Sequence, residues 1–293
     1  MKKRLCENRT VIITGAGGGL GKTYALALAE AGANVIVNDI NLETAEETVS
    51  EIIAKDGRAV ANNSDITNYQ QAGSMVQLAL DTFSGLDVII NNAGITRDRM
   101  FTSLSEQEWD DVVRVHLKGH FCLASHGAKY WRKMSKEGAP VNARIINTTS
   151  GAGLQGSVGQ TNYAAAKGGI ASLTLVQAAE LGRYGVTVNG LAPAARTPMT
   201  ENVFADMMKK PVDGFDYYDP ANVAPLVVWL ASHESSQVTG RIFEVEGGRI
   251  ASADGWRSTE GVNKDQRWDP AELHDAIKNI IAKETPAQKV FGS

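Results

Sequence analysis

The stretch QTNYAAAKGG places a tyrosine and a lysine four residues apart, at Tyr163 and Lys167. The three alanines between them are strong helix formers that carry no chemistry. Because residues four apart on a helix share one face, the phenol and the ammonium should point the same way. A free tyrosine pKa of about 10 is too high for a general base at neutral pH, and a nearby cation lowers it. The spacing indicates a tyrosine activated for proton transfer, although alone it also fits an ordinary surface helix.

A glycine-rich turn, TGAGGGLG, follows the apolar run VIIT and leads into a helical stretch. Gly15 permits the tight turn, Gly19 lets the backbone approach a pyrophosphate, and Gly21 allows close packing of helix on strand. Free N–H groups at the start of the helix, around Leu20, favour phosphate binding. Such a turn is weak evidence by itself, but its place between a strand and a helix indicates a dinucleotide site.

An acid stands at the end of the next apolar run, NVIVN, at Asp39. A carboxylate at this point would accept hydrogen bonds from the adenosine ribose hydroxyls and would repel a 2′-phosphate. The glycine turn contains no arginine that would offset this repulsion. We therefore expect NAD rather than NADP, the alternative for Asp39 being a simple helix cap.

The elements that would position these residues alternate along the chain. Short apolar runs without interspersed polar residues indicate buried parallel strands, and the longer stretches between them have helical spacing. We expect an α/β fold of the Rossmann type, with a doubly wound parallel sheet of about seven strands in one domain (1–248) and a C-terminal extension (249–293). The helical stretch 270–284 should pack on the body or on a partner subunit. Expected strands are 11–14, 34–38, 59–61, 88–90, 144–147, 186–191 and 241–245; expected helices are 20–31, 42–55, 69–83, 105–134 (one or two) and 160–184.

Composition limits the classes of function. The 293 residues are 43% apolar and 21% charged, with a net charge of -4, which is ordinary for a soluble protein and disfavours nucleic acid or anionic membranes as partners. Cys6 and Cys122 stand far apart, without a metal-binding cluster, so we expect no disulfide and no metal. No segment has the length of a signal sequence core or a membrane span, and a cytoplasmic setting fits.

Taken together, these motifs resemble the short-chain dehydrogenase/reductase family over residues 8 to about 248. The resemblance adds NNAG at 91–94, a serine thirteen residues before the tyrosine (163−150), and a loop PAART at 193–197. It implies that Tyr163 removes the alcohol proton, that Ser150 hydrogen-bonds the substrate oxygen, and that Lys167 also holds the nicotinamide ribose. The implied cofactor-binding residues are Gly15, Gly19, Leu20, Gly21, Asp39, Asp65, Asn91, Ala93, Gly94, Tyr163, Lys167, Pro193 and Thr197. Alanine follows Pro193 where the family usually has glycine.

One position departs from the family pattern. In RVHLKGHF, His116 stands where the family usually has an asparagine that supports a water chain from the lysine. A histidine can donate, accept and titrate near neutrality, so His116 could relay protons as a catalytic residue, or it could equally be a packed histidine bonded to backbone. His120, by contrast, is expected to be ordinary surface or core.

Longer stretches, including VHLKGHF and LAPAARTPMT, are similar to the (3R)-hydroxyacyl-CoA and 17β-hydroxysteroid dehydrogenases within the family. This resemblance implies oxidation of a 3-hydroxyacyl-CoA or sterol-derived hydroxyl, with an NADPH-dependent 3-oxoacyl reductase or a non-catalytic NAD-binding regulator as alternatives. It also implies a homodimer or homotetramer. Arg97, Arg99 and Arg196 could contact CoA phosphates, although Arg97, Asp98 and Arg99 could instead pair internally. The segment 197–220 should form a substrate lid, with Met199, Val203, Phe204, Met207, Met208, Phe215, Tyr217 and Tyr218 as its apolar contacts.

Overall fold

The computed structural model describes residues 4–197, 208–264, 266–285 and 288–293. An eight-stranded sheet runs through the molecule in the order β3-β2-β1-β4-β5-β6-β7-β8. Strands β1 to β7 pair in parallel, and only β8 runs antiparallel, against β7. The strands are β1 Thr10–Thr14, β2 Asn34–Asn38, β3 Arg58–Asn62, β4 Val88–Asn91, β5 Ala143–Thr148, β6 Val186–Ala194, β7 Ile242–Glu246 and β8 Arg249–Ala253.

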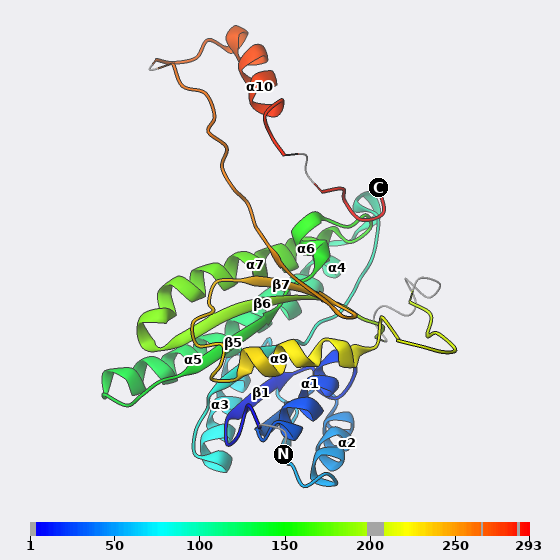
Figure 1. Cartoon of the computed structure of the whole chain (residues 1–293), viewed down its shortest axis with the longest axis vertical. Coiled ribbons are helices and arrows are strands. Elements are labelled where there is room, and N and C mark those ends of the chain that lie inside the picture. Colours follow the sequence, from blue (N-terminus) through cyan, green and yellow to red (C-terminus); the bar gives the residue numbers. More distant parts are fainter. Residues whose placement is uncertain (1–3, 198–207, 265, 286–287) are drawn as a thin grey trace.

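Helices cover both faces of this sheet (Figure 1). One core contains apolar residues of α1, α2 and α9 against the strands, and the other contains those of α3, α5 and α7. The strands between them are buried on both faces, which explains why β1, β2, β4 and β5 consist largely of β-branched residues. The helices are α1 Gly19–Glu30, α2 Leu42–Ile53, α3 Tyr69–Phe83, α4 Glu106–Val113, α5 Gly119–Lys136, α6 Gly151–Gln155, α7 Thr161–Leu181, α9 Ala224–Ala231 and α10 Leu273–Ile281.

The strand order reverses between β1 and β4. In open α/β sheets, ligands bind outside the carboxyl ends of the strands at such a switch point. The glycine turn follows β1, and the NNAG motif follows β4 from Asn91 on. Both motifs therefore meet at the edge where a ligand is expected.

The predicted stretch 105–134 is two helices joined by a single π-helical turn, Arg114–Lys118. A capping box of Ser105 and Glu108 starts α4. A π turn inserts one extra residue into the helix, which rotates the side chains around it and is frequent at functional sites. His116 lies in this turn.

The sheet extends further than the sequence indicated. Glu246 of β7 pairs with Arg249 of β8 across a tight turn in which Gly247 has a φ of +51°. The about seven strands expected in residues 1–248 are therefore joined by an eighth, which lies in the part of the chain that the sequence analysis assigned to the extension. The run RIASA lacks the apolar pattern of the inner strands because β8 is an edge strand that pairs only with β7, and none of its residues is buried.

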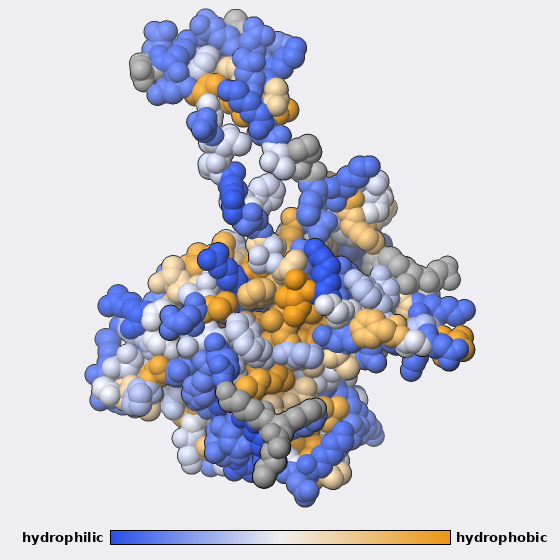
Figure 2. Space-filling model, in the orientation of Figure 1, coloured by the Kyte–Doolittle hydropathy of each residue, from blue (hydrophilic) through white to orange (hydrophobic). Residues whose placement is uncertain are grey.

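The C-terminal extension leaves the body and returns to it (Figure 1). Helix α10 stands apart from the sheet, with Leu273, Ile277 and Ile281 exposed. Figure 2 shows apolar side chains among the hydrophilic ones of this protruding segment. The end of the chain then pairs with the loop before α7: Val158 N–H donates to the Phe291 carbonyl (2.9 Å), and Phe291 N–H donates to the Gly156 carbonyl (3.2 Å).

Candidate active site

The glycine turn has the geometry of a phosphate cradle. Gly15 has a φ of +63°, and a Cβ on Gly21 would lie 2.0 Å from the Gly15 carbonyl oxygen. Gly18, at the N-terminus of α1, has no heavy atom within 4 Å of the place of a Cβ, and no side chain of the described residues caps the helix. The first backbone N–H groups of α1 therefore have no side-chain acceptor among the described residues, which fits a helix start that takes a dinucleotide pyrophosphate.

The NNAG loop is fastened to this turn. The backbone N–H groups of Asn92 and Ala93 donate to Thr14 Oγ1 (2.9 and 3.1 Å), and the Asn92 side chain donates to the Thr14 and Gly15 carbonyls. A Cβ on Gly15 would lie 2.8 Å from Ala93 Cα. Sequence analysis assigned no role to Thr14, although its position at the end of β1 is the signal that could have found it.

Two acids lie beside the cradle at the strand ends. Asp39 Oδ2 accepts a hydrogen bond from Gly17 N–H (3.1 Å), and Oδ1 accepts one from Asn41 N–H (3.1 Å). Asp65 Oδ1 accepts from Thr67 N–H (2.8 Å), in the loop between β3 and α3. Asp39 therefore touches the glycine turn, and Asp65 lies in the loop after the neighbouring strand β3, at the same end of the sheet. Asn91 lies deeper, where its amide donates to Asn147 Oδ1 (3.0 Å) and joins β4 to β5.

The three residues with proton chemistry meet at the start of α6 and α7. Ser150 caps α6, and its hydroxyl lies close enough to the Tyr163 phenol to lower the pKa of that group. Lys167 follows one turn along α7, with its Nζ 5.5 Å from the centre of the Tyr163 ring. The Lys167 side chain is 2% exposed and donates to the Thr148 carbonyl (2.6 Å), a partner that sequence analysis missed.

The pKa values of this pair differ from the expectation. Burial raises the pKa of Tyr163 to about 12, against a smaller lowering by the hydrogen bond with Ser150. Burial also lowers the pKa of Lys167 to about 7. The prediction that Lys167 lowers the tyrosine pKa is not met in the protein alone, because loss of water disfavours both charged forms.

His116 is buried behind these residues. Its Nε2 lies 2.7 Å from the Ile95 carbonyl and 3.0 Å from Ile95 N–H, and its ring meets the Tyr163 ring edge-on at 5.1 Å. Burial lowers the pKa of His116 to about 3, with repulsion by Lys167 adding to this. Of the two roles that the sequence left open, these contacts fit the packed histidine bonded to backbone. His120 is 1% exposed and belongs to the core.

Comparison with known proteins agrees with this arrangement. The family model described as short chain dehydrogenase matches residues 9–208. The chain belongs to the short-chain dehydrogenase family.

Individual relatives are similar over most of this short-chain dehydrogenase. A hydroxyacyl-CoA dehydrogenase, ChsB1 of Mycobacterium tuberculosis, is 42% identical over 96% of this chain and 91% of its own length. Peroxisomal multifunctional enzyme type 2 of Mus musculus is also 42% identical, over 94% of this chain but only 37% of its own length. The crystal structure of a short-chain dehydrogenase from Mycobacterium avium has a TM-score of 0.91 and 53% identity, covering 99% of this chain and 100% of the other. 3-Oxoacyl-[acyl-carrier-protein] reductases match as well. The dehydrogenase is thus an oxidoreductase of CH–OH groups.

Contacts of Arg196 hold together the two ends of the segment that follows β6. Pro193 lies within β6, and Arg196, which follows it, forms a two-pronged ion pair with Asp216 and donates to the Met208 carbonyl (2.8 Å). Arg196 N–H also donates to the Tyr218 carbonyl. Arg196 is therefore engaged in holding the predicted lid rather than facing a CoA phosphate.

Only part of that lid belongs to the described residues. Thr197 is the last residue before the gap, and Met199, Val203, Phe204 and Met207 lie outside the described residues. Met208 is buried, whereas Phe215 is 64% exposed and meets Tyr217 edge-on, and Tyr217 meets Tyr218 in the same way.

The other two candidate arginines, Arg97 and Arg99, lie in the connection between β4 and α4. Arg99 Nε pairs with Glu108 (3.3 Å), and Arg99 N–H donates to the Gly159 carbonyl (2.8 Å). Arg97 is exposed, and its carbonyl accepts from the Asn162 side chain. The sequence left open whether these arginines contact CoA phosphates or pair internally with Asp98. The structure pairs Arg99 with Glu108 of α4, and the Asp98 carboxylate accepts from the Gln160 side chain.

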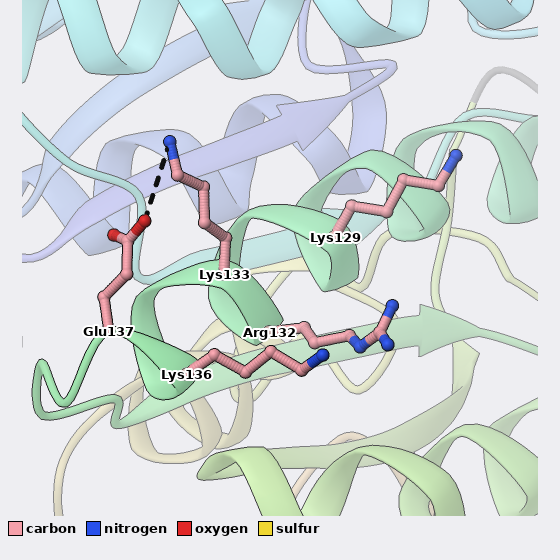
Figure 3. Close-up of a pocket in the computed structure, with 5 residues that line it drawn as sticks. All are labelled: Lys129, Arg132, Lys133, Lys136 and Glu137. Carbon is pink, nitrogen blue, oxygen red and sulfur yellow. Dashed lines mark ion pairs between the residues drawn. The ribbon is translucent and has the colours of Figure 1, made fainter.

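A surface hollow of about 300 Å³ lies elsewhere, between basic side chains of α5 (Figure 3). Lys129, Arg132, Lys133, Lys136 and Glu137 line it. The end of α5 leads to the start of β5, so this end of the hollow lies toward the amino ends of the strands, away from the candidate active site at their carboxyl ends. Within the described part of the chain, no cluster of His, Cys, Asp or Glu could hold a metal, and no helix is long and apolar enough to span a membrane.

Proposed function

We propose that this enzyme oxidises the hydroxyl of a 3-hydroxyacyl-CoA or of a sterol-derived side chain, with NAD as hydride acceptor. The observation that carries the proposal is the meeting of Ser150, Tyr163 and Lys167 at the starts of α6 and α7. The NNAG loop connects this group to the glycine turn, since Ala93 packs on Gly15 and Gly94 packs on His116. The similarity to a hydroxyacyl-CoA dehydrogenase over nearly the full length of both chains supports the substrate class.

Each residue has a defined role in the proposed reaction. Ser150 donates a hydrogen bond to the substrate oxygen, and Tyr163 as phenolate takes the hydroxyl proton while the C–O bond becomes a carbonyl. The nicotinamide of bound NAD would supply the hydride acceptor. Lys167, held by Thr148, lies close enough to Tyr163 to stabilise the phenolate when it is itself protonated.

Asp39 supports NAD as the cofactor. Its carboxylate is fixed against the glycine turn by Gly17 N–H, where a ribose 2′-phosphate would meet negative charge. We expect Asp39→Ala to relax the preference for NAD over NADP by roughly tenfold or more, since one repulsive contact is worth at least about 1.4 kcal/mol in a partly buried site. The ratio of kcat/KM for the two cofactors measures this. An unchanged ratio would remove Asp39 from the cofactor site.

The substrate class is tested by NADH formation on a panel. It contains (3R)- and (3S)-3-hydroxyacyl-CoA of several chain lengths, a sterol side-chain hydroxyacyl-CoA and a 17β-hydroxysteroid. We expect turnover of one acyl-CoA epimer with NAD and little with NADP. Turnover of the free steroid alone would change the proposed substrate class but leave the proposed hydride-transfer reaction in place. Turnover only of 3-oxoacyl thioesters with NADPH would favour a reductase of the kind to which this chain is also similar.

Tyr163→Phe separates an enzyme from a non-catalytic NAD-binding regulator. The substitution removes the proton acceptor but keeps the ring, so kcat should fall by about 10²–10⁴-fold while NADH still binds. Turnover and NADH titration of the same preparation give both readouts. Equal activity of variant and parent would contradict the mechanism.

The same proposal includes a homo-oligomer. The apolar residues exposed on α10 lack cover from the described body of the protein, and a second copy would supply it. A homodimer or homotetramer with a small-molecule acyl-CoA or steroid substrate is the assembly we propose.

A further inference from the structure

His116 touches two parts of the candidate active site at once. Through Nε2 it contacts the peptide of Ile95, and through its ring edge it contacts Tyr163. His116 lies in the π turn of residues 114–118, and from there its ring reaches Gly94 and Ile95 in the loop that follows β4. The ring is 1% exposed, so its contacts are not shared with solvent.

Gly94 is shaped to this ring. A Cβ on Gly94 would lie 2.1 Å from His116 Cε1, 2.9 Å from Nδ1 and 3.0 Å from Nε2. Gly94 does not have the positive φ that would by itself require glycine. The imidazole is therefore the described group that forbids a side chain at this position.

The loop between these contacts is anchored at both ends. Asn92 and Ala93 are fastened to Thr14 beside the glycine turn, and Ile95 is fastened to His116. A displacement of the ring would loosen the end of the loop nearest Tyr163 while the Thr14 end stays fixed. The position of the loop and the position of the Tyr163 ring thus depend on the same imidazole.

The contacts argue against a proton-carrying role for His116. Whichever tautomer is present, the same nitrogen, Nε2, is engaged by Ile95, as donor to its carbonyl or as acceptor from its N–H. Nε2 is therefore occupied in holding the backbone of Ile95, which is a positioning contact.

We propose that Gly94 and His116 act as a coupled pair that positions the NNAG loop and the Tyr163 ring, and that His116 is a positioning residue rather than a proton relay. This inference rests on the proposed function only in that the positioned groups are those of the dehydrogenase site. The packing of imidazole on Gly94 exists whatever the substrate is.

A double-mutant cycle tests the pair, with Gly94→Ala, His116→Ala and the double variant. Thermal unfolding without cofactor and NADH dissociation constants are measured for each. We expect Gly94→Ala to weaken NADH binding roughly tenfold in the parent but less than about twofold in the His116→Ala background, because the added methyl then has room. The unfolding midpoint should show the same non-additivity. Additive effects in both measurements would overturn the coupling.

Gly85→Ala is the matched control, since no atom lies within 4 Å of its Cβ position, and it should leave both readouts unchanged. His116→Gln is measured beside the cycle, because its amide reaches about as far as Nε2 and cannot become a cation, and it keeps the test open if His116→Ala fails to fold. Positioning predicts that His116→Gln keeps NADH affinity and kcat near those of the parent, with the same pH profile. A relay predicts an altered pH profile, low kcat and unchanged NADH affinity, which would refute the inference.

Because the unfolding cycle needs neither substrate nor cofactor, it separates this inference from the proposed function. If the effects of the two substitutions on unfolding are non-additive in a protein that turns over none of the panel, the coupling of Gly94 with His116 stands and the substrate class is refuted. If the effects on unfolding and on NADH binding are additive in an active dehydrogenase, the coupling is refuted and the proposed function stands.

Discussion

At the scale of single residues, burial sets the charge states of the site. The pKa of Tyr163 is raised to about 12 and the pKa of Lys167 is lowered to about 7, although the two residues share a helix face. Both shifts favour the neutral form, so at neutral pH the protein alone holds a phenol beside a partly deprotonated amine. The phenolate that the proposed mechanism needs would therefore depend on additional positive charge near the site.

The lowered pKa of Lys167 has a measurable effect on stability. The amine has an ordinary value of 10.5, so between about pH 7 and pH 10 the unfolded chain binds a proton that the folded protein lacks. Stability must then rise with pH in this window, by up to about 1.4 kcal/mol per pH unit from this group. Below pH 7 both states are protonated, and the buried charge destabilises the fold.

Lys167→Met removes this group. We expect the variant to be more stable than the parent at pH 6. This difference in the free energy of unfolding (variant minus parent) should fall as the pH rises toward 10. Urea unfolding of both proteins at each pH measures the difference, in which other titrating groups cancel. A pH-independent difference would show that Lys167 stays charged in the folded protein.

The residues of the candidate site were largely predictable, and their electrostatics were not. The spacing of Ser150, Tyr163 and Lys167 follows from chain positions alone, and the structure brings the three together. The direction of the tyrosine shift depends on how much water surrounds the phenol, which no spacing encodes. For the same reason the sequence left open the two roles of His116 and could not show that Arg196 would be held by Asp216.

At the scale of elements, the contact of α6 with α7 fixes the two halves of the site. Gly153 of α6 packs on the backbone of α7, where a Cβ would lie 2.5 Å from the Lys167 carbonyl carbon. Thr149 Oγ1 donates to the Lys167 carbonyl (2.7 Å) beside it. The distance between Ser150 and Lys167 is thus set by backbone packing rather than by flexible side chains.

We expect Gly153→Ala to destabilise the fold by about 1–3 kcal/mol, the usual cost of overpacking, and to lower kcat more than it raises the KM for NAD. Gly182→Ala, at the other end of α7, is the control: nothing lies within 4 Å of its Cβ position, so stability should be unchanged. Thermal unfolding and steady-state kinetics of both variants give the comparison. Similar behaviour of the two would contradict tight packing at Gly153.

Long periodic elements were predictable, and short ones were not. The stretches 34–38 and 69–83 coincide with β2 and α3, because apolar runs and helical spacing extend over their whole length. Sequence analysis did not identify α6, with five residues, or α9, whose run APLVVWLA is apolar all round. Periodicity needs more than one turn and a polar face to be visible.

At the scale of the whole molecule, the alternation of strands and helices predicted the doubly wound sheet, since few architectures bury every strand on both faces. The placement of the extension could not be predicted. Its helix has an apolar stripe, and a stripe indicates that something covers it without indicating what. That the extension packs on the body or on a partner subunit stays a prediction, and α10 is where it can be tested.

Replacing Ile277 and Ile281 with glutamate should lower the oligomeric mass, because charges would face the apolar cover that we propose. The unfolding midpoint measured at low protein concentration should change little, since both side chains are exposed in the single chain. Light scattering coupled to size exclusion measures the mass. Exchange of the exposed Trp256 for glutamate is the control, and equal masses for all three proteins would exclude α10 from the interface.

The return of the chain end to the loop of Gly156–Val158 bears on how this protein should be handled. Phe291 is bonded to that loop and lies two residues from the C-terminus, whereas the chain enters the sheet at Thr10, at the edge opposite the active site. An affinity tag fused after Ser293 would pull on the loop that joins Ser150 to Tyr163, the two residues that the proposed mechanism uses for proton transfer. Kinetic work therefore calls for a tag at the N-terminus.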